Sequence, residues 1–339
     1  IAAFAASCTE SQEPDPAIDI EFLSQSPLFP GAAYEITDLE LSFHVVEFHP
    51  FGDKYVIAGF DGFVVTDHDF NVLTEFKDDL ITHKVLTYGG VALVATNRGL
   101  FQINASVEVK KILEVPITDL EIDGSGRLLF VQGLGELSKE KQEPANIHIL
   151  NLQEQSSEFF TDPTDSLNTF LNQIEIAADG TIWALGSEHT IFQFRAGEMI
   201  QRFSNETLDI LPDMEIYTGQ GLLEVEGNTV YYATDNVHEK RVVRYDGAWD
   251  LFLRVDVTGF LELYQQDLIS SHTRDVEIIG DEVWLGYRDG IIRSSGDEFT
   301  IVQDPNLLDM GIDKIYPFDD GRMVFILNQR QIAEVRPGL

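Results

Sequence analysis

The sixteen residues Ile278–Arg293, IIGDEVWLGYRDGIIR, contain the pattern that decides the fold. An apolar pair comes before a turn at Gly280, a Trp-centred apolar run follows, and a second turn at Asp289 and Gly290 leads into another apolar run. Short runs of β-branched, aromatic and aliphatic residues separated by glycine-containing turns are typical of antiparallel strands joined by hairpins. This stretch therefore predicts consecutive β-strands.

The same sequence pattern recurs from Phe43 onward in seven copies. Their turn glycines are Gly52, Gly90, Gly124, Gly180, Gly227, Gly280 and Gly321. Their spacing, roughly 35 to 55 residues, is the period of propeller blades. Stretches with a helical period are nearly absent. A single small sheet cannot bury both of its faces, but sheets stacked around an axis bury them against one another. The sequence predicts an all-β protein that folds as a seven-bladed β-propeller over residues 34–339.

The two ends of the chain are expected to meet in this ring. The last copy supplies only three strands, at Lys314–Phe318, Arg322–Leu327 and Gln331–Arg336, and Tyr34–Phe43 reads as a strand with no copy of its own. We expect the N-terminal strand to complete the last blade and close the ring.

Three copies carry a resemblance to a known family. The segments AADGTIWALGS (Ala177–Ser187), Ile278–Arg293 and VALVATNRGLFQI (Val91–Ile103) resemble the two-component regulator propeller repeat, with its Asp-Gly turn, Trp-centred strand and Gly-Leu or Gly-Ile strand. The resemblance implies a sensor-like propeller, similar to the extracytoplasmic domains of hybrid histidine kinases and to stand-alone secreted propellers. Because the repeat is a structural motif, it implies no catalytic residues.

Charge excludes one class of partner. Asp and Glu number 58 and Lys and Arg 22, which gives a formal charge of -36. Such a field repels phosphate backbones and anionic head groups, so we expect no nucleic-acid partner. The acidic residues are scattered along the whole chain, which indicates either a strongly solvated surface or a docking surface for a basic partner or for cations.

The single cysteine, Cys8, follows the small residues Ala5, Ala6 and Ser7 and precedes a polar, acidic, proline-containing stretch. This pattern resembles a bacterial lipobox, which implies cleavage before Cys8 and a diacylglycerol group on its thiol. Residues 1–7 are then the remnant of a signal peptide and 8–33 a lipid-anchored acidic tether. An incidental thiol in a frayed terminus is the alternative.

The acidic residues just after Cys8 resemble the export tag of some Gram-negative surface lipoproteins: Glu10, Glu13 and Asp15. The expected location is the outer membrane, exposed at the surface or facing the periplasm. In Asp165-Ser166-Leu167, Ser166 fits an O-glycosylation sequon of such lipoproteins.

Few residues suggest chemistry. Asp67, Asp69 and Asn71 have the spacing of a calcium loop, but Val72 occupies the place of the required glycine, which favours a hairpin turn. We predict no catalytic residue and no cofactor or metal beyond this weak calcium candidate. Trp183 and Trp284 occupy equivalent strand positions and are expected in the core between blades.

The long insertions 133–146, 159–171 and 251–273 enlarge connections between strands, and propellers build binding surfaces from such loops. The sequence favours a non-enzymatic, membrane-anchored propeller that binds an outer-membrane or other envelope protein as an accessory subunit. One alternative is a glycan- or peptide-binding receptor. Another is a glycan hydrolase or lyase whose site gathers groups such as Asp179 or His189 in the central funnel. Carboxylates converging in the funnel would favour these alternatives.

Overall fold

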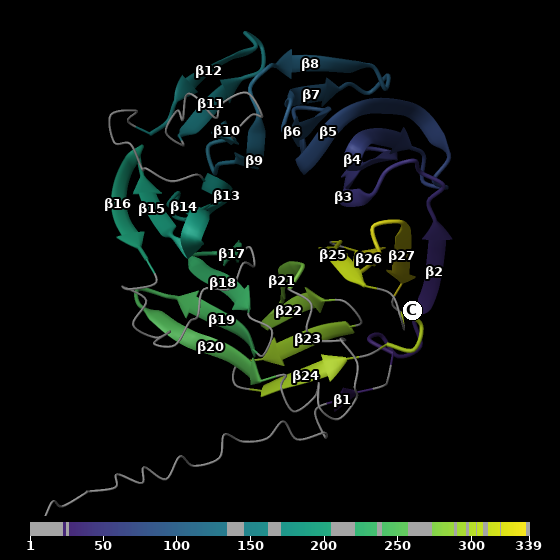
Figure 1. Ribbon diagram of the computed structural model, residues 1–339, viewed down its shortest axis with the longest axis vertical. Coiled ribbons are helices and arrows are strands. Elements are labelled where there is room, and N and C mark those ends of the chain that lie inside the picture. Colours follow the sequence, from purple (N-terminus) through teal and green to yellow (C-terminus); the bar gives the residue numbers. More distant parts are fainter. Residues whose placement is uncertain are drawn as a thin grey trace, which may run out of the picture.

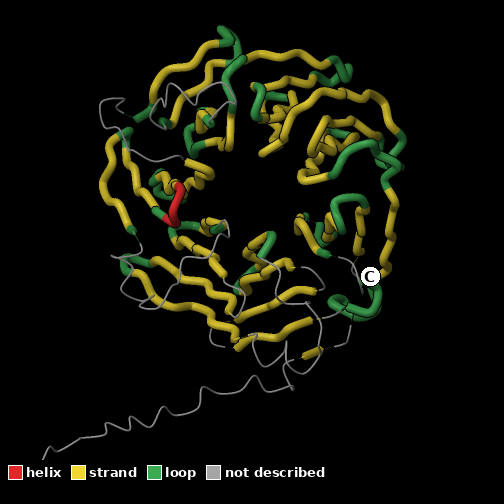
Figure 2. Tube along the Cα trace, in the orientation of Figure 1, coloured by secondary structure: helices red, strands yellow, loops and turns green. Residues whose placement is uncertain are grey.

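The computed structural model describes residues 23–24, 27–133, 146–161, 171–204, 221–235, 239–256, 273–287, 290–295, 298–302, 304–307, 311–318 and 320–336. Its sheets stand around a common axis as a β-propeller, in chain order (Figure 1). Strands dominate the described chain, and the helix drawn in red in Figure 2 is the single turn η2 (Ser187–His189). Within the described ranges, no helix has the length and apolarity needed to cross a bilayer.

The first sheet around the ring has six strands: β3 (Val45–Phe51), β4 (Lys54–Thr66), β5 (Val72–Tyr88), β6 (Val91–Thr96), β7 (Gly99–Ile103) and β8 (Val109–Leu113). The second contains β9 (Ile117–Ile122), β10 (Leu128–Gln132), β11 (Ile147–Asn151) and β12 (Ser156–Phe159). The third contains β13 (Leu171–Ile176), β14 (Ile182–Gly186), β15 (Ile191–Arg195) and β16 (Glu198–Phe203).

The fourth sheet contains β17 (Leu222–Glu226), β18 (Thr229–Asp235), β19 (Glu239–Tyr245) and β20 (Trp249–Asp256). The fifth contains β21 (Asp275–Ile279), β22 (Glu282–Tyr287), β23 (Gly290–Ser295), β24 (Glu298–Val302) and β1 (Leu23–Ser24). The sixth contains β25 (Ile312–Pro317), β26 (Met323–Leu327), β27 (Gln331–Arg336) and β2 (Ala33–Asp38).

The prediction of seven blades is wrong, because the strands form six hydrogen-bonded sheets and, counted by these sheets, the propeller is six-bladed. The first two of the seven sequence copies share one sheet. β5 runs without interruption from Val72 to Tyr88 and pairs with β4 through its first part and with β6 through its second. The segment 77–80 between the two parts contains no glycine or proline, buries Leu80 in the core and stays extended. The merged sheet consequently contributes two strands, β3 and the second part of β5, to the innermost layer of the ring.

The predicted closure of the ring is confirmed. β2 pairs antiparallel with β27 from Ala33 opposite Arg336 to Asp38 opposite Gln331, so the N-terminal strand completes the last sheet. The strand is shorter than the expected Tyr34–Phe43. β1 adds a contact that the sequence did not indicate, since it pairs in parallel with β24, the edge strand of the preceding sheet.

The hydrophobic core lies between neighbouring sheets. Trp183 of β14 is 2% exposed and packs in one cluster with Leu223 and Tyr232 of the following sheet. Trp284 of β22 packs in the same way with residues of the last sheet, including Phe325. The prediction that both tryptophans belong to the core between blades is therefore confirmed, and this packing holds the innermost strands in fixed positions around the axis.

Candidate functional site

Several of the residues singled out by the sequence lie outside the described residues. These are Cys8, the acidic residues after it, and Ser166, together with 134–145, 162–170 and 257–272, which are most of the three insertions. Lipid attachment and O-glycosylation stay predictions. The first insertion joins the second strand of its sheet, β10, to the third, β11. The other two join the outermost strand of one sheet to the innermost strand of the next, β12 to β13 and β20 to β21. In an antiparallel propeller these connections all belong to one end of the ring, which we call the insertion end.

The calcium candidate forms a hairpin turn between β4 and β5. The Oδ1 atom of Asp67 accepts hydrogen bonds from the backbone N–H groups of Asp69 and Asn71, at 3.0 and 2.9 Å, and Oδ2 accepts one from the Asn71 side-chain amide at 2.9 Å. The hydrogen bonds of the turn thus use both oxygen atoms of the Asp67 carboxylate. In the described part of the chain, no group of three or more His, Cys, Asp or Glu residues is arranged to hold a metal ion. The sequence favoured this hairpin turn and kept calcium only as a weak candidate, which stays untested.

Asp179 and His189 do not come together. Asp179 lies in the turn before β14, where it accepts a hydrogen bond from Thr181 N at 2.9 Å and pairs with Arg195. His189 follows β14 at its opposite end, is 8% exposed, and its Nδ1 atom is hydrogen-bonded to the Tyr232 hydroxyl. Neither residue joins the charged side chains of the innermost strands described below.

The innermost strands carry a set of polar side chains at equivalent register positions, which we call the tie ring: Glu47 (β3), Lys84 (β5), Asp119 (β9), Gln173 (β13), Asp275 (β21) and Lys314 (β25). Their main contacts join one innermost strand to the next. Asp119 Oδ2 accepts a hydrogen bond from Ile174 N at 2.7 Å, and Asp275 Oδ2 accepts one from Ile315 N at 2.7 Å. Such hydrogen bonds, donated by backbone N–H groups to buried carboxylates, hold adjacent sheets together.

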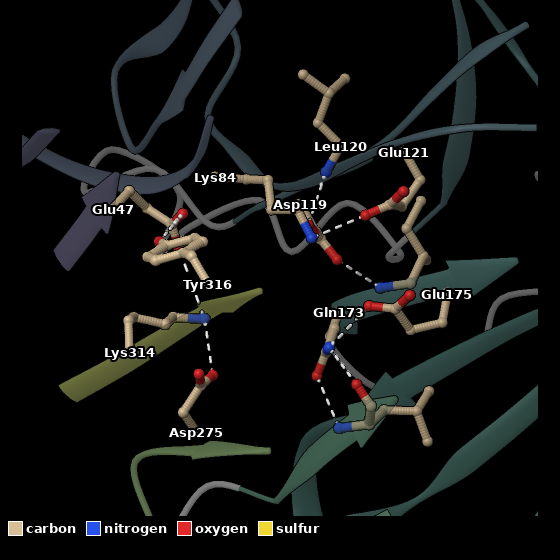
Figure 3. Close-up of polar contacts among 12 residues, drawn as sticks. Glu47, Lys84, Asp119, Leu120, Glu121, Gln173, Glu175, Asp275, Lys314 and Tyr316 are labelled. Atoms are coloured by element: carbon tan, nitrogen blue, oxygen red, sulfur yellow. Dashed lines mark hydrogen bonds and ion pairs between the residues drawn. The ribbon is translucent and has the colours of Figure 1, made fainter. Parts of the chain in front are cut away.

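Two lysines complete the tie ring. Lys314 Nζ lies 3.1 Å from Asp275 Oδ1 and 3.8 Å from Glu47 Oε1, and Lys84 Nζ lies 2.8 Å from Glu121 Oε1 and 3.9 Å from Asp119 Oδ1. Figure 3 shows Lys314 and Lys84 in two separate groups of polar contacts. Burial favours the neutral amines, but the surrounding carboxylates outweigh it and raise the pKa of both lysines well above the usual value. Both lysines are therefore charged and already paired.

A second set lies two residues further along four consecutive innermost strands, and we call it the glutamate arc: Glu121 (β9), Glu175 (β13), Glu224 (β17) and Glu277 (β21). Side chains two residues apart on a strand point to the same side, and the step is about 6.6 Å. The arc is thus nearer than the tie ring to the end that carries the glycine turns before the second strand of each copy. We call this the turn end.

Two members of the glutamate arc have no hydrogen-bond or ion-pair partner among the described residues. Glu121 is paired with Lys84, and Glu175 accepts a hydrogen bond from Gln173 Nε2 at 3.0 Å. Glu224 and Glu277 have neither a hydrogen bond nor an ion pair with any described residue. Glu224 is enclosed by protein on nearly every side and keeps partial solvent contact. Its carboxyl group therefore has no direct partner in the described chain, and Lys84 and Lys314 act on it only from beyond ion-pair distance.

Burial and like charge raise the pKa of these carboxyl groups. Desolvation, followed by repulsion from Glu277, raises the pKa of Glu224 to about 8. Desolvation, followed by repulsion from Asp275, raises the pKa of Glu277 to about 8. Burial raises the pKa of Asp119 to about 6 and that of Glu175 well above its usual value. The arc consequently holds protons at neutral pH that a bound cation could replace.

The charge balance on the axis is strongly acidic. The tie ring and the glutamate arc together hold seven carboxyl groups against the ammonium groups of Lys84 and Lys314. On β3 and β25 the positions that correspond to the arc are His49 and Tyr316. Burial lowers the pKa of His49 to about 4, so its imidazole is neutral and adds no positive charge. This site favours a positively charged ligand group.

The sequence contained a signal for this arc that single strands did not reveal. Glu121, Glu224 and Glu277 each stand three residues before a turn glycine, at Gly124, Gly227 and Gly280. Glu175 stands five residues before Gly180. A glutamate repeated at one place in consecutive copies of an apolar strand points to the same ring position, which a comparison among the copies could have found.

No family model matches the chain, and no curated protein matches it. Solved propellers do: "YCF48 bound to D1 peptide" has a TM-score of 0.63 at 11% identity, covering 92% of this chain and 99% of that one. An extracellular domain of a putative hybrid two-component system from B. thetaiotaomicron has a TM-score of 0.65 at 11% identity, covering 91% of this chain and 43% of that one. A streptogramin B lyase has a TM-score of 0.62 at 10% identity, covering 90% and 98%.

These likenesses show the propeller fold, on which proteins of different function are built. The solved neighbours include extracellular domains of hybrid two-component systems, in keeping with the resemblance of the repeat. They also include propellers in complex with a peptide and with the protein ARL6.

Proposed function

We propose that this protein is a non-enzymatic binding propeller that holds a positively charged segment of a protein partner at its axis. The carrying observation is the pair Glu224 and Glu277, two enclosed glutamates without a hydrogen bond or an ion pair to any described residue. Uncompensated buried carboxyl groups cost free energy of folding, and a ligand cation recovers that cost on binding. The net charge of -36 adds long-range attraction for a basic partner.

The proposal includes a place in the cell. The lipobox-like context of Cys8 supports a lipid anchor, and the acidic stretch after it supports the outer membrane of a Gram-negative bacterium. The partner is then an outer-membrane or other envelope protein, with this chain as its accessory subunit. Neighbours of the same fold that bind a peptide and ARL6 support protein binding as a use of the propeller.

The test begins with purification of the lipidated protein from its own membranes in mild detergent. Mass spectrometry should find one envelope protein in stoichiometric amount. The reconstituted complex should weaken steeply between 50 and 500 mM NaCl, salt concentrations chosen to screen charge–charge attraction. A protein that emerges alone, or a complex indifferent to salt, would contradict the proposal.

A second candidate function rests on the same carboxyl groups. Glutamates whose pKa is raised to about 8 hold a proton at neutral pH, which is the state a general acid needs. Hydrolysis or elimination on a glycan would use such an acid with a second carboxylate as base. Screening polysaccharides for release of reducing ends, with Glu224→Gln and Glu277→Gln as controls, tests this alternative. Turnover lost in both variants would replace binding by catalysis.

A further inference from the structure

We propose that the glutamate arc is a site for one guanidinium or primary ammonium group, and that this group enters the axis from the turn end. The inference rests on the proposed function and specifies both the chemical group that is bound and the face of the ring on which the partner lies.

The arrangement of the arc selects an organic cation. Glu175, Glu224 and Glu277 come from three consecutive innermost strands, each in a different sheet. In keeping with this, no metal-holding group of His, Cys, Asp or Glu occurs within the described residues. A guanidinium or ammonium ion carries several N–H donors and can hydrogen-bond to two or more separated carboxylates at once.

The order of charges along the axis selects the direction of entry. From the insertion end a ligand first meets the tie ring, where Asp119 and Asp275 already accept hydrogen bonds from backbone N–H groups and lie beside the charged Lys84 and Lys314. From the turn end it meets the glutamate arc first, because the arc lies two residues closer to the turns. The charged lysines lie deeper along this path, and their positive charge keeps the cation at the arc.

This direction differs from the expectation that the insertions form the binding surface. The described strand ends that flank the insertions lie at the opposite end of the ring. The turn end carries short turns such as Gly280-Asp281, which begins three residues after Glu277 on its hairpin and leaves Asp281 exposed. A partner can therefore place one basic side chain between these short turns and reach the arc.

The first experiment compares two ligands that differ only in charge. N-acetylarginine amide and the neutral N-acetylcitrulline amide are titrated into the full chain by calorimetry at pH 8.5 in 150 mM NaCl. Arginine amide should bind at least tenfold more tightly than citrulline amide. The double variant Glu224→Gln/Glu277→Gln should lose at least tenfold in affinity. The control Glu198→Gln/Glu226→Gln, which removes equal charge at two exposed positions, should change affinity less than twofold.

The second experiment tests the direction of entry. A bulky maleimide label is attached to Asp281→Cys at the turn end or to Asp79→Cys at the insertion end, each in a chain carrying Cys8→Ser. Both positions are exposed, and they lie four residues after Glu277 and five residues before Lys84. The Asp281 label should weaken arginine amide binding at least tenfold, and the Asp79 label less than twofold.

The outcomes separate this inference from the proposed function. Equal affinity for both ligands, or a double variant that binds like its control, overturns the site even if a salt-sensitive protein partner has been isolated. Blocking by the Asp79 label overturns the direction of entry. Arginine amide binding without an isolated partner leaves the site intact and contradicts the proposed accessory role.

Discussion

Replacing Glu224 by Gln should flatten the dependence of stability on pH. The pKa of Glu224 is raised to about 8 by burial and by repulsion from Glu277 and Asp275, partly offset by Lys84 and Lys314. Between pH 5 and 7 the folded protein keeps this proton and the unfolded chain has released it. Stability therefore falls as pH rises through this window.

The magnitude follows from about 1.4 kcal/mol per pH unit for one fully shifted group. Two pH units give a loss of about 2.7 kcal/mol from Glu224, and Glu277 contributes in the same direction because its pKa is also raised to about 8. The neutral amide of Glu224→Gln removes the contribution of Glu224. It also weakens that of Glu277, because the repulsion between the two carboxyl groups is lost. We expect the stability difference between pH 5 and 7 to shrink by about 3 kcal/mol.

Urea unfolding at pH 5 and pH 7 measures this difference in the wild type and in each variant. Glu226→Gln is the matched control, because Glu226 ends the same strand, β17, with an exposed side chain. It should leave the pH dependence within about 0.5 kcal/mol of the wild type. The reasoning is refuted if Glu224→Gln retains the wild-type pH dependence or if the control reproduces its effect.

Three further predictions concern the frame and the anchor. Asp119→Ala removes the acceptor of the backbone N–H groups of Ile174 and Leu120 and should destabilise the protein by about 2–4 kcal/mol in urea unfolding, whereas a loss below about 1 kcal/mol would show that water replaces the carboxylate. Deleting residues 36–43 removes half of the closing strand and should lower the melting temperature of the whole ring in one calorimetric transition, and an unchanged melting temperature would end the closure argument. Cys8→Ala should move the protein from the membrane to the soluble fraction, and retention after alkaline washing would exclude lipid anchoring.

The sequence predicted the β-propeller and its closure because both depend on local pattern. Alternating turns and apolar runs define the strands, and the unmatched segment at Tyr34 has one free edge to join, that of β27. The number of sheets could not be predicted in the same way. It depends on whether Lys77–Leu80 turns away or stays extended, and a segment of three charged residues and a leucine without glycine or proline is compatible with both.

The candidate site was predicted only in outline. The sequence identified a funnel that could gather carboxylates but named Asp179 and His189, which lie at opposite ends of β14. The side chains that do gather come from different sheets, and each appears in the sequence as a single charge within an apolar strand. A comparison of the copies could have aligned Glu121, Glu224 and Glu277 by their distance from the turn glycine, but the register of the strands was needed to place Glu175 with them.

The most direct test of the account is a crystal structure of the protein grown at pH 8.5 with N-acetylarginine amide. The account predicts the guanidinium between the carboxylates of Glu224 and Glu277, with the rest of the ligand leading toward the turn end. A ligand bound only at the outer surface, or an axis in which Glu224 and Glu277 contact water alone at saturating ligand, would contradict it.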